Sequence, residues 1–206
     1  MMILLDDGFQ HLKLHRDIDL LLLDSRKPFD NGYLLPKGML REPLSALSRA
    51  DAFIFTRSNV EAVQSAKCKV QNGVLPENRP VFRTAHVPYL RGKNIAGKKI
   101  FAFSGIADNN DFLETLNNFD CELAGFEKFS DHYAYSDDDL NRIFESTKNV
   151  SANMLVTTEK DYARISDRLE KFPFEVGIIG IEISFGNDAA AFENFIIDRL
   201  NRDSQD

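Results

Sequence analysis

The stretch MMILLDDGFQH, at residues 1–11, joins an unbroken apolar run to a pair of aspartates and a glycine. An apolar run without polar alternation is typical of a strand that is buried on both faces in a parallel sheet. Residues 1–5 are therefore predicted to form such a strand, with Asp6 and Asp7 at its carboxyl end. Because a buried strand needs neighbours, the chain is expected to begin in the middle of a sheet.

Short apolar runs of the same kind recur at residues 20–23, 52–55, 100–103, 154–156 and 176–183. Between several of these runs the apolar residues instead share one face of a helix. Three such faces are predicted: Phe112, Leu113, Leu116 and Phe119; Leu140, Ile143 and Phe144; and Phe192, Phe195, Ile196 and Leu200. Strands that alternate with helices predict an α/β fold with parallel sheets.

A domain boundary is predicted at residues 87–99 (VPYLRGKNIAGKK), where a proline and two glycines interrupt the pattern and basic residues gather. This segment is expected to be a linker, or hinge. It would join a first domain at residues 1–86 to a C-terminal α/β domain at residues 100–206, which includes the final amphipathic helix.

The composition argues against several classes of protein. The 206 residues include 25 Lys+Arg and 32 Asp+Glu, a net charge of −7, so no overall positive field attracts nucleic acid. Cys68 and Cys121 have neither disulfide-framework nor zinc-site spacing, which favours a reducing compartment. No apolar run approaches the ~20 residues that span a bilayer, and no signal-peptide pattern is present. The chain as given is expected to be soluble.

The first candidate site is the turn that follows the first predicted strand. Carboxylates at the carboxyl end of a parallel strand lie where α/β folds bind ligands, and in phosphoryl-transfer enzymes such an aspartate holds Mg²⁺ beside the nucleotide phosphates. Asp6 and Asp7 are candidates for that role. Gly8 permits close backbone approach, while Gln10 and His11 add an amide and an imidazole. The alternative is that one aspartate caps the turn and the other is solvated.

The second candidate site is LPKGMLREP at residues 35–43. Its proline and glycine predict a structured loop, and Pro43 suits the start of a short helix. Arg41 is a bidentate anion binder and lies beside Glu42, a possible metal ligand. The alternative is a surface loop that contains an ordinary ion pair.

The third candidate site is FSDHY at residues 129–133. Asp131 and His132 supply a carboxylate and an imidazole, which suits proton transfer or a metal or phosphate contact. The alternative is that His132 is a hydrogen-bonded structural residue. The same structural interpretation is given to His15 and His86, which have no comparable neighbours in the sequence.

The fourth candidate site is TTEKD at residues 157–161, at a predicted turn from strand to helix. Backbone N–H groups at a helix start attract anions, and Lys160 adds positive charge. Thr158 followed by Asp161 also fits a hydroxyl cap with an acid three residues later, so capping alone is the alternative.

Taken together, these motifs closely resemble the tetraacyldisaccharide 4′-kinase family. The resemblance rests on DDGFQH at 6–11, LPxGxLREP at 35–43, RAD at 49–51, FSGI at 103–106, SDH at 130–132 and TTEKD at 157–161. It covers nearly the whole chain. It implies phosphorylation of the 4′-hydroxyl of the lipid A disaccharide precursor, with ATP and Mg²⁺, at the cytoplasmic face of the bacterial inner membrane.

The resemblance also implies a P-loop kinase core that a β-stranded hinge joins to a smaller C-terminal α/β domain. Family members carry a Gly-rich P-loop, and an aspartate thought to be the catalytic base, upstream of the DDGFQH motif. No GxxxxGK[ST] sequence occurs in these 206 residues. The chain is therefore expected to correspond to the C-terminal portion of such a kinase, without the N-terminal strands of the core sheet and without the family's membrane helix. By itself it is expected to be inactive.

The resemblance also implies roles for individual residues at the matching motif positions. Catalytic roles are expected for Asp6, Asp7, Asp131 and His132. Contacts with ATP or substrate are expected for Gln10, His11, Arg41 and Lys160. The metal ion is expected to be held by Asp7 and Glu42. In this scheme the histidine, oriented by its aspartate neighbour, supports the catalytic base as its dyad partner.

Two other functions compete with the kinase. A phosphatase of the haloacid-dehalogenase type also places an aspartate after an apolar strand, but its motif has a second aspartate two positions later. Gly8 and Phe9 stand at the corresponding positions after Asp6 and Asp7, which disfavours that class. The other alternative is a folded remnant of the kinase, or an interaction module derived from it, without catalytic activity.

Overall fold

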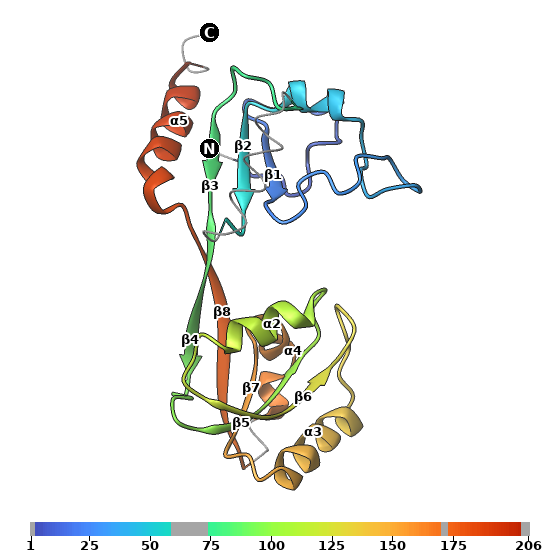
Figure 1. The fold of residues 1–206 in the computed structure, drawn as a ribbon, viewed down its shortest axis with the longest axis vertical. Coiled ribbons are helices and arrows are strands. Elements are labelled where there is room, and N and C mark those ends of the chain that lie inside the picture. The colour runs from blue at the N-terminus through green and yellow to red at the C-terminus, as the bar shows by residue number, and fades with distance from the viewer. Residues whose placement is uncertain (1–2, 59–73, 170–172, 203–206) are drawn as a thin grey trace. The chain divides into compact units, whose positions relative to one another are not determined.

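The computed structural model describes residues 3–58, 74–169 and 173–202 (Figure 1). Cys68 and the first two residues of the predicted first strand lie outside these ranges. The chain divides into two compact units: Met1–Val87 with Ile183–Asp206 forms unit 1, and Pro88–Glu182 forms unit 2. Both units combine strands with helices, so the α/β fold class is confirmed.

Unit 1 is built on a parallel sheet of three strands in the order β1-β2-β3. The strands are β1 (Leu20–Asp24), β2 (Ala52–Thr56) and β3 (Val81–Arg83). β2 is the central strand and pairs with both neighbours, as its unbroken apolar run predicts. Successive side chains of a strand point to opposite faces, so the two faces of β2 belong to two different cores.

One face of β2 carries Phe53 and Phe55, which pack with Leu47 of the 3₁₀ helix η1 (Leu44–Arg49). The other face carries Ala52 and Ile54, which share a core with Phe82 of β3. Helix α5 (Ala189–Arg202) packs on that second core. Both faces of the small sheet are therefore covered, as a parallel sheet requires.

Unit 2 is built on a sheet of five strands in the order β4-β8-β7-β5-β6. The strands are β4 (Ala85–Gly92), β5 (Lys99–Ser104), β6 (Glu122–Lys128), β7 (Met154–Thr158) and β8 (Glu175–Ser184). The β5–β6, β5–β7 and β7–β8 pairs are parallel. β5 and β7, the most buried strands, coincide with apolar runs predicted from the sequence.

Helices cover both faces of this sheet. They are α2 (Asn109–Leu116), α3 (Asp137–Asn149) and α4 (Glu159–Leu169). The short 3₁₀ helix η3 (Gly186–Asp188) follows β8 and belongs to unit 1. Side chains of α3 and α4 share a core with Phe103 and Leu155, whereas α2 packs on the opposite face with Ile100 and Val156. The predicted helical faces are confirmed for Phe112, Leu113 and Leu116 and for Leu140 and Ile143. Phe119 packs on the same core as α2 but lies beyond the end of that helix.

The predicted strand at residues 1–5 is wrong for the described residues. Residues 3–5 have no strand assignment, and Ile3 and Leu4 are 77% and 85% exposed. A parallel strand forms only where a neighbouring backbone supplies its hydrogen bonds, and no described strand pairs with this segment. Asp6 and Asp7 consequently lie on a turn, not at a strand end.

The division into domains also differs from the sequence prediction. Residues 87–99 are not simply a linker, because β4 runs through Gly92 and the boundary between the units falls inside β4 and β8. The final helix belongs to unit 1, not to a domain at residues 100–206. Its Phe192 and Phe195 rings pack with their centroids 5.1 and 5.6 Å from that of Phe82, and this contact covers part of the apolar face that the sequence shows.

A capping box begins α3. The backbone N–H of Asp139 donates to Ser136 Oγ at 3.1 Å, and the backbone N–H of Ser136 donates back to Asp139 Oδ2 at 2.9 Å. The hydrogen bonds from Ser136, side chain first and then backbone, hold the pKa of the Asp139 carboxyl at about 2. The two residues therefore stabilise the first turn of α3 reciprocally.

Replacing this cap gives a stability prediction. Ser136→Ala is expected to lower the free energy of unfolding by about 1 kcal/mol at neutral pH. Because the pKa of folded Asp139 is below its ordinary value, its contribution is complete above about pH 4 and is lost as pH falls toward 2. Urea titrations followed by circular dichroism at neutral pH and near pH 2 measure the free energy of unfolding. Ser136→Ala should lower it less at the acidic pH. Ser166→Ala, inside α4, is the control and should be close to neutral; equal effects of the two changes would contradict the capping role.

Candidate functional site

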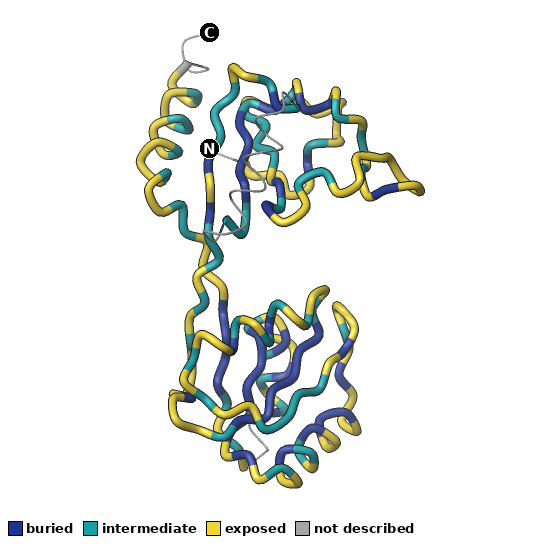
Figure 2. The backbone as a smooth tube through the Cα atoms, viewed as in Figure 1, coloured by how far each residue is buried: buried dark blue, intermediate teal, exposed yellow. Residues whose placement is uncertain are grey.

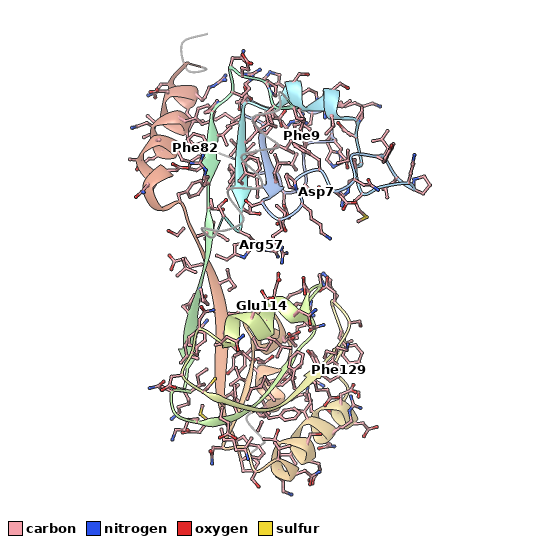
Figure 3. The ribbon with its side chains drawn as sticks, viewed as in Figure 1. Asp7, Phe9, Arg57, Phe82, Glu114 and Phe129 are labelled. Carbon is pink, nitrogen blue, oxygen red and sulfur yellow. The ribbon has the colours of Figure 1, made fainter. Side chains whose placement is uncertain are left out.

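In unit 1 the DDGFQH turn contacts the LREP loop through an ion pair. Arg41 Nη1 donates to Asp7 Oδ1 at 3.1 Å and to Asp7 Oδ2 at 2.8 Å. The Asp7 and Arg41 side chains remain 75% and 60% exposed, so the pair contributes little to stability, ~0–1 kcal/mol. The structure therefore brings two predicted site residues together in an exposed ion pair. Figure 3 labels Asp7 and Phe9 of this turn.

Arg49, from the RAD motif, holds the two segments in place. Its Nη2 donates to Glu42 Oε2 at 2.5 Å and to the backbone carbonyl of Phe9 at 3.2 Å. Its guanidinium also lies over the Phe9 ring, 4.5 Å from the centroid. Three motifs that are separated in the sequence, DDGFQH, LREP and RAD, thus meet around one half-buried arginine.

Asp6, Gln10 and His11 lie exposed on the same turn. The backbone carbonyls of Gly8 and His11 accept hydrogen bonds from Arg16 Nη1 at 3.3 and 2.6 Å. Asp7 adopts a left-handed backbone conformation, with φ 51°. The turn is therefore fixed through its backbone, while its polar side chains face solvent and are accessible to a ligand.

The two predicted metal ligands differ in availability. Both carboxylates are paired with an arginine, but the Asp7 side chain is 75% exposed, whereas the Glu42 side chain is only 23% exposed. In the part of the chain that the structure describes, no group of three or more His, Cys, Asp or Glu side chains is placed to hold a metal ion. Mg²⁺ often takes only one or two protein carboxylates together with phosphate and water ligands. Asp7 fits that requirement, and Glu42 fits it less well.

Sequence reasoning missed polar residues at the carboxyl edge of the unit 1 sheet. Asp24 ends β1 and contacts Arg57, just after β2, at 2.6 Å. Ser25 Oγ lies 2.8 Å from Ser58 Oγ at the same edge. Ligands of α/β folds bind outside this edge of a sheet. The signal was present in the sequence, because LLLLD at residues 20–24 repeats the pattern of an apolar run that ends in aspartate.

In unit 2 the SDH loop meets the first turns of α4. Lys160 Nζ donates to Asp131 Oδ1 at 2.6 Å, and this hydrogen bond holds the pKa of the Asp131 carboxyl below its ordinary value. Arg164 Nη2 lies 3.0 Å from His132 Nδ1. The structure thus brings together the predicted residues Asp131, His132 and Lys160. Arg164 was not predicted, since one arginine on a helix surface carries no distinguishing sequence signal.

Asp161 connects the start of α4 to the end of β5. Its side chain is fully buried, and Oδ2 accepts hydrogen bonds from the backbone N–H of Gly105 at 2.9 Å and from Thr158 Oγ1 at 2.8 Å. The backbone N–H of Asp161 donates in turn to Thr158 Oγ1 at 3.1 Å. The TTEKD motif therefore caps α4, as one interpretation of the sequence held, and also fastens the end of β5 to that helix.

Gly105 is required by close packing at this point. A Cβ atom there would lie 2.9 Å from the Tyr135 hydroxyl and 3.2 Å from Asp161 Oδ1. Burial first, and then the nearby negative charge of Asp161, raise the pKa of Tyr135. The glycine of FSGI, the aspartate of TTEKD and a tyrosine that follows SDH thus pack closely together, next to the backbone of Ser130 in the SDH loop.

Comparison with known proteins shows which family the chain belongs to. The model of the family described as tetraacyldisaccharide-1-P 4′-kinase matches residues 1–201. The chain belongs to the tetraacyldisaccharide-1-P 4′-kinase family. The resemblance recognised in the sequence motifs is therefore confirmed, and it extends through both units.

Curated relatives named tetraacyldisaccharide 4′-kinase include one from Syntrophobacter fumaroxidans, 36% identical over 99% of this chain and 55% of its own length. Another, from Syntrophus aciditrophicus, is 37% identical over 96% of this chain and 57% of its own length. The chain spans about half the length of the curated family members that it matches.

A solved family structure supports the fold. The crystal structure of the "apo" form of LpxK from Aquifex aeolicus in complex with ATP aligns with a TM-score of 0.60 at 25% identity. The alignment covers 94% of this chain and 56% of the LpxK chain.

In the part of the chain that the structure describes, no helix is long and apolar enough to cross a membrane.

Proposed function

We propose that a protein containing this chain transfers the γ-phosphate of ATP to the 4′-hydroxyl of the tetraacyldisaccharide lipid A precursor, in a Mg²⁺-dependent reaction. The observation that carries the proposal is the clustering of the family motifs into two groups of charged side chains. Asp7 and Arg41 form one group in unit 1, and Asp131, His132 and Lys160 form the other in unit 2. The names of the relatives supply the substrate, and the ATP complex of LpxK supplies the nucleotide.

The charges of the unit 1 group suit phosphoryl transfer. The transferring group spreads negative charge over its oxygens, so catalysis is chiefly positioning and charge neutralisation. Arg41 offers a guanidinium fork that matches a phosphate, and Asp7 offers a carboxylate for Mg²⁺. When bound, Mg²⁺ supplies neutralisation of the phosphate charge. In the free chain Asp7 and Arg41 bind each other. Because an exposed ion pair contributes little free energy, Mg²⁺ and a phosphate can replace these contacts with little loss of stability.

The unit 2 group suits the handling of a proton. His132 is the titratable group beside Asp131, and Lys160 keeps Asp131 ionised by lowering its pKa. In the proposed reaction His132 orients the carboxylate that accepts the proton of the 4′-hydroxyl. This assignment makes His132 a partner of the base and not the base itself.

A chimera tests the function. The N-terminal half of the Syntrophobacter fumaroxidans relative, up to its match with this chain, is joined to residues 1–206. The chimera is expected to phosphorylate the tetraacyldisaccharide precursor with ATP and Mg²⁺, and the intact relative is the positive control. A chimera that has a normal circular dichroism spectrum and thermal transition but transfers no phosphate would instead support a non-catalytic module derived from the kinase.

We further propose peripheral contact with the cytoplasmic face of the bacterial inner membrane through the apolar loop, residues 31–41. Figure 1 shows this blue segment extending away from the sheet of unit 1, and Figure 2 shows it exposed along most of its length. Its exposed apolar side chains are Tyr33, Leu34, Leu35 and Met39. Lys37 lies 3.8 Å over the Tyr33 ring, and no acidic residue occurs between positions 31 and 41.

Three backbone N–H groups of the apolar loop donate to carbonyls within the loop. The N–H of Leu35 donates to the carbonyl of Leu40, the N–H of Leu40 to Tyr33, and the N–H of Gly38 to Leu34, at 3.0–3.2 Å. Such hydrogen bonds lower the cost of placing the backbone in the bilayer interface. The apolar tip then matches acyl chains, and Lys37 matches anionic headgroups, although the whole chain carries a charge of −7.

Vesicle binding checks this contact. The double change Leu35→Asp with Met39→Asp is expected to weaken sedimentation of the chain with anionic vesicles by at least ~10-fold, because two exposed apolar side chains lose their burial. Leu123→Asp, at an exposed apolar position of unit 2, is the control and should bind like the original chain. Equal binding by the double variant and the original chain would contradict the proposed loop contact.

A further inference from the structure

The imidazole ring of His132 lies between two cations of α4. Its Nδ1 is 3.0 Å from Arg164 Nη2, and its Nε2 is 3.5 Å from Lys160 Nζ. Asp131 Oδ2 lies 3.7 Å from Nε2. His132 adopts a left-handed backbone conformation with φ 59°, which histidine adopts more often than most residues other than glycine.

The contact with Arg164 determines which nitrogen of the neutral His132 ring carries the proton. A guanidinium has only donors, and 3.0 Å is an ordinary hydrogen-bond distance, so Nδ1 of His132 must accept from Arg164. A ring nitrogen that accepts carries no proton, and a neutral imidazole therefore holds its single proton on Nε2. The opposite tautomer would place two N–H donors face to face at 3.0 Å.

Lys160 does not reverse this assignment. Its ammonium lies 3.5 Å from Nε2, at the outer limit of a hydrogen bond, whereas it donates to Asp131 Oδ1 at 2.6 Å. Asp131 is thus the common acceptor, with one oxygen on Lys160 and the other nearest to Nε2. A proton on Nε2 faces the Asp131 carboxylate. It is compatible with the distances from Nε2 to Lys160 and to Asp131, and with the hydrogen bond between Lys160 and Asp131.

We propose that Arg164 is a positioning residue that holds His132 in the neutral Nε2–H tautomer. The ring then presents an N–H donor toward carboxylates on its Nε2 side. The catalytic consequence rests on the proposed function: such a donor can orient the carboxylate that accepts the substrate proton. A ring with its proton on Nδ1 would offer that carboxylate only a lone pair.

The support beneath Arg164 makes it suited to this task. Arg164 Nη1 lies 4.0 Å from Asp161 Oδ1, and Asp161 is fully buried. The guanidinium of Arg164 is therefore within ion-pair distance of a buried carboxylate. Because Asp161 is also bonded to Gly105 and Thr158, the position of Arg164 is tied to the core of unit 2 and not only to the helix surface.

Nitrogen NMR of the chain as it stands tests the tautomer directly. The sequence contains only four histidines, His11, His15, His86 and His132, so a ¹⁵N-histidine sample gives few signals. Long-range ¹H–¹⁵N correlations distinguish the two neutral tautomers at about pH 8, where an ordinary histidine is uncharged. His132→Gln assigns the signals. We expect His132 in a single Nε2–H form, and a wild-type ring with its proton on Nδ1, or in a mixture of tautomers, would overturn the proposal.

Variants of α4 then test the role of Arg164. Arg164→Ala should release the ring into a mixture in which the Nδ1–H form is detectable, whereas Arg164→Lys, which keeps a donor, should restore much of the preference. Arg168→Ala is the matched control, since Arg168 contacts the Tyr135 carbonyl and Asp137, and His132 should be unaffected. An unchanged His132 spectrum in folded Arg164→Ala would refute the assignment.

These measurements need neither ATP nor substrate, so their outcome is separate from the activity of the chimera. If Arg164→Ala does not fold, as judged by circular dichroism, the wild-type tautomer and the Arg164→Lys spectrum still decide the question. An inactive chimera together with a fixed Nε2–H tautomer would leave the positioning role standing and remove only its catalytic consequence.

Discussion

A polypeptide of residues 1–206 alone is expected to transfer no phosphate from ATP to the tetraacyldisaccharide precursor. The backbone amides and lysine of a P-loop normally cradle the β- and γ-phosphates, and no GxxxxGK[ST] sequence occurs in these residues. Since stabilisation of the transferring group is worth ~10³-fold or more, turnover should fall at least that far below the chimera. Transfer of radiolabelled phosphate to the lipid measures it.

The chimera serves as the positive control in the same assay, with the same lipid preparation. Phosphorylation that rises in proportion to the concentration of the 206-residue chain would show that phosphate binding does not depend on a P-loop. Loss of that signal in Asp7→Asn would then be needed to exclude a contaminating kinase. Absence of transfer by the chain and its presence in the chimera would locate the missing phosphate cradle in the added half.

The part of the fold that the sequence predicted is the part that local patterns determine. β2, β5 and β7 are unbroken apolar runs with neighbours on both sides, and each forms a strand where the pattern places it. The capping box of α3 needs only residues 136–139, so it too is visible in the sequence. These features depend on contacts within a few residues, or on burial that any neighbouring strand can provide.

The features that the sequence did not predict depend on distant partners. Residues 3–5 are as apolar as β2 but have no described strand to pair with. The face of α5 is visible in the sequence, yet only the structure shows that Phe82 of β3, more than a hundred positions earlier, covers it. A hydrophobic pattern predicts that one face of a helix packs against another element, but it does not identify that element.

The candidate site shows the same limit for charged residues. Glu42 next to Arg41 suggested a metal ligand beside an anion binder, but Glu42 is bound by Arg49 and Arg41 by Asp7. Adjacent side chains in a loop take separate partners when two other segments approach from different sides. The motifs therefore identified the right segments, whereas the pairing within them required the structure.

Asp7→Asn in the chimera is expected to lower kcat by at least ~100-fold, or about 3 kcal/mol, if Asp7 holds Mg²⁺ at the phosphates, because the lost charge acts mainly in the transition state. Asparagine is preferable to alanine here, since Asp7 has φ 51° and asparagine tolerates that conformation. The exposed pair with Arg41 predicts almost unchanged stability. The measurements are turnover at saturating ATP, a Mg²⁺ titration and thermal unfolding.

Asp30→Asn is the matched control for Asp7→Asn, because Asp30 is also exposed and has φ 46° in the same unit. The two variants make the same chemical change in the same backbone conformation, so any general effect of that change appears in both. A role at the metal predicts that only Asp7→Asn loses turnover and needs more Mg²⁺ for half-maximal activity. If both variants turn over normally at saturating ATP and Mg²⁺, Asp7 is only one half of a surface ion pair with Arg41, and the proposed metal site in unit 1 is wrong.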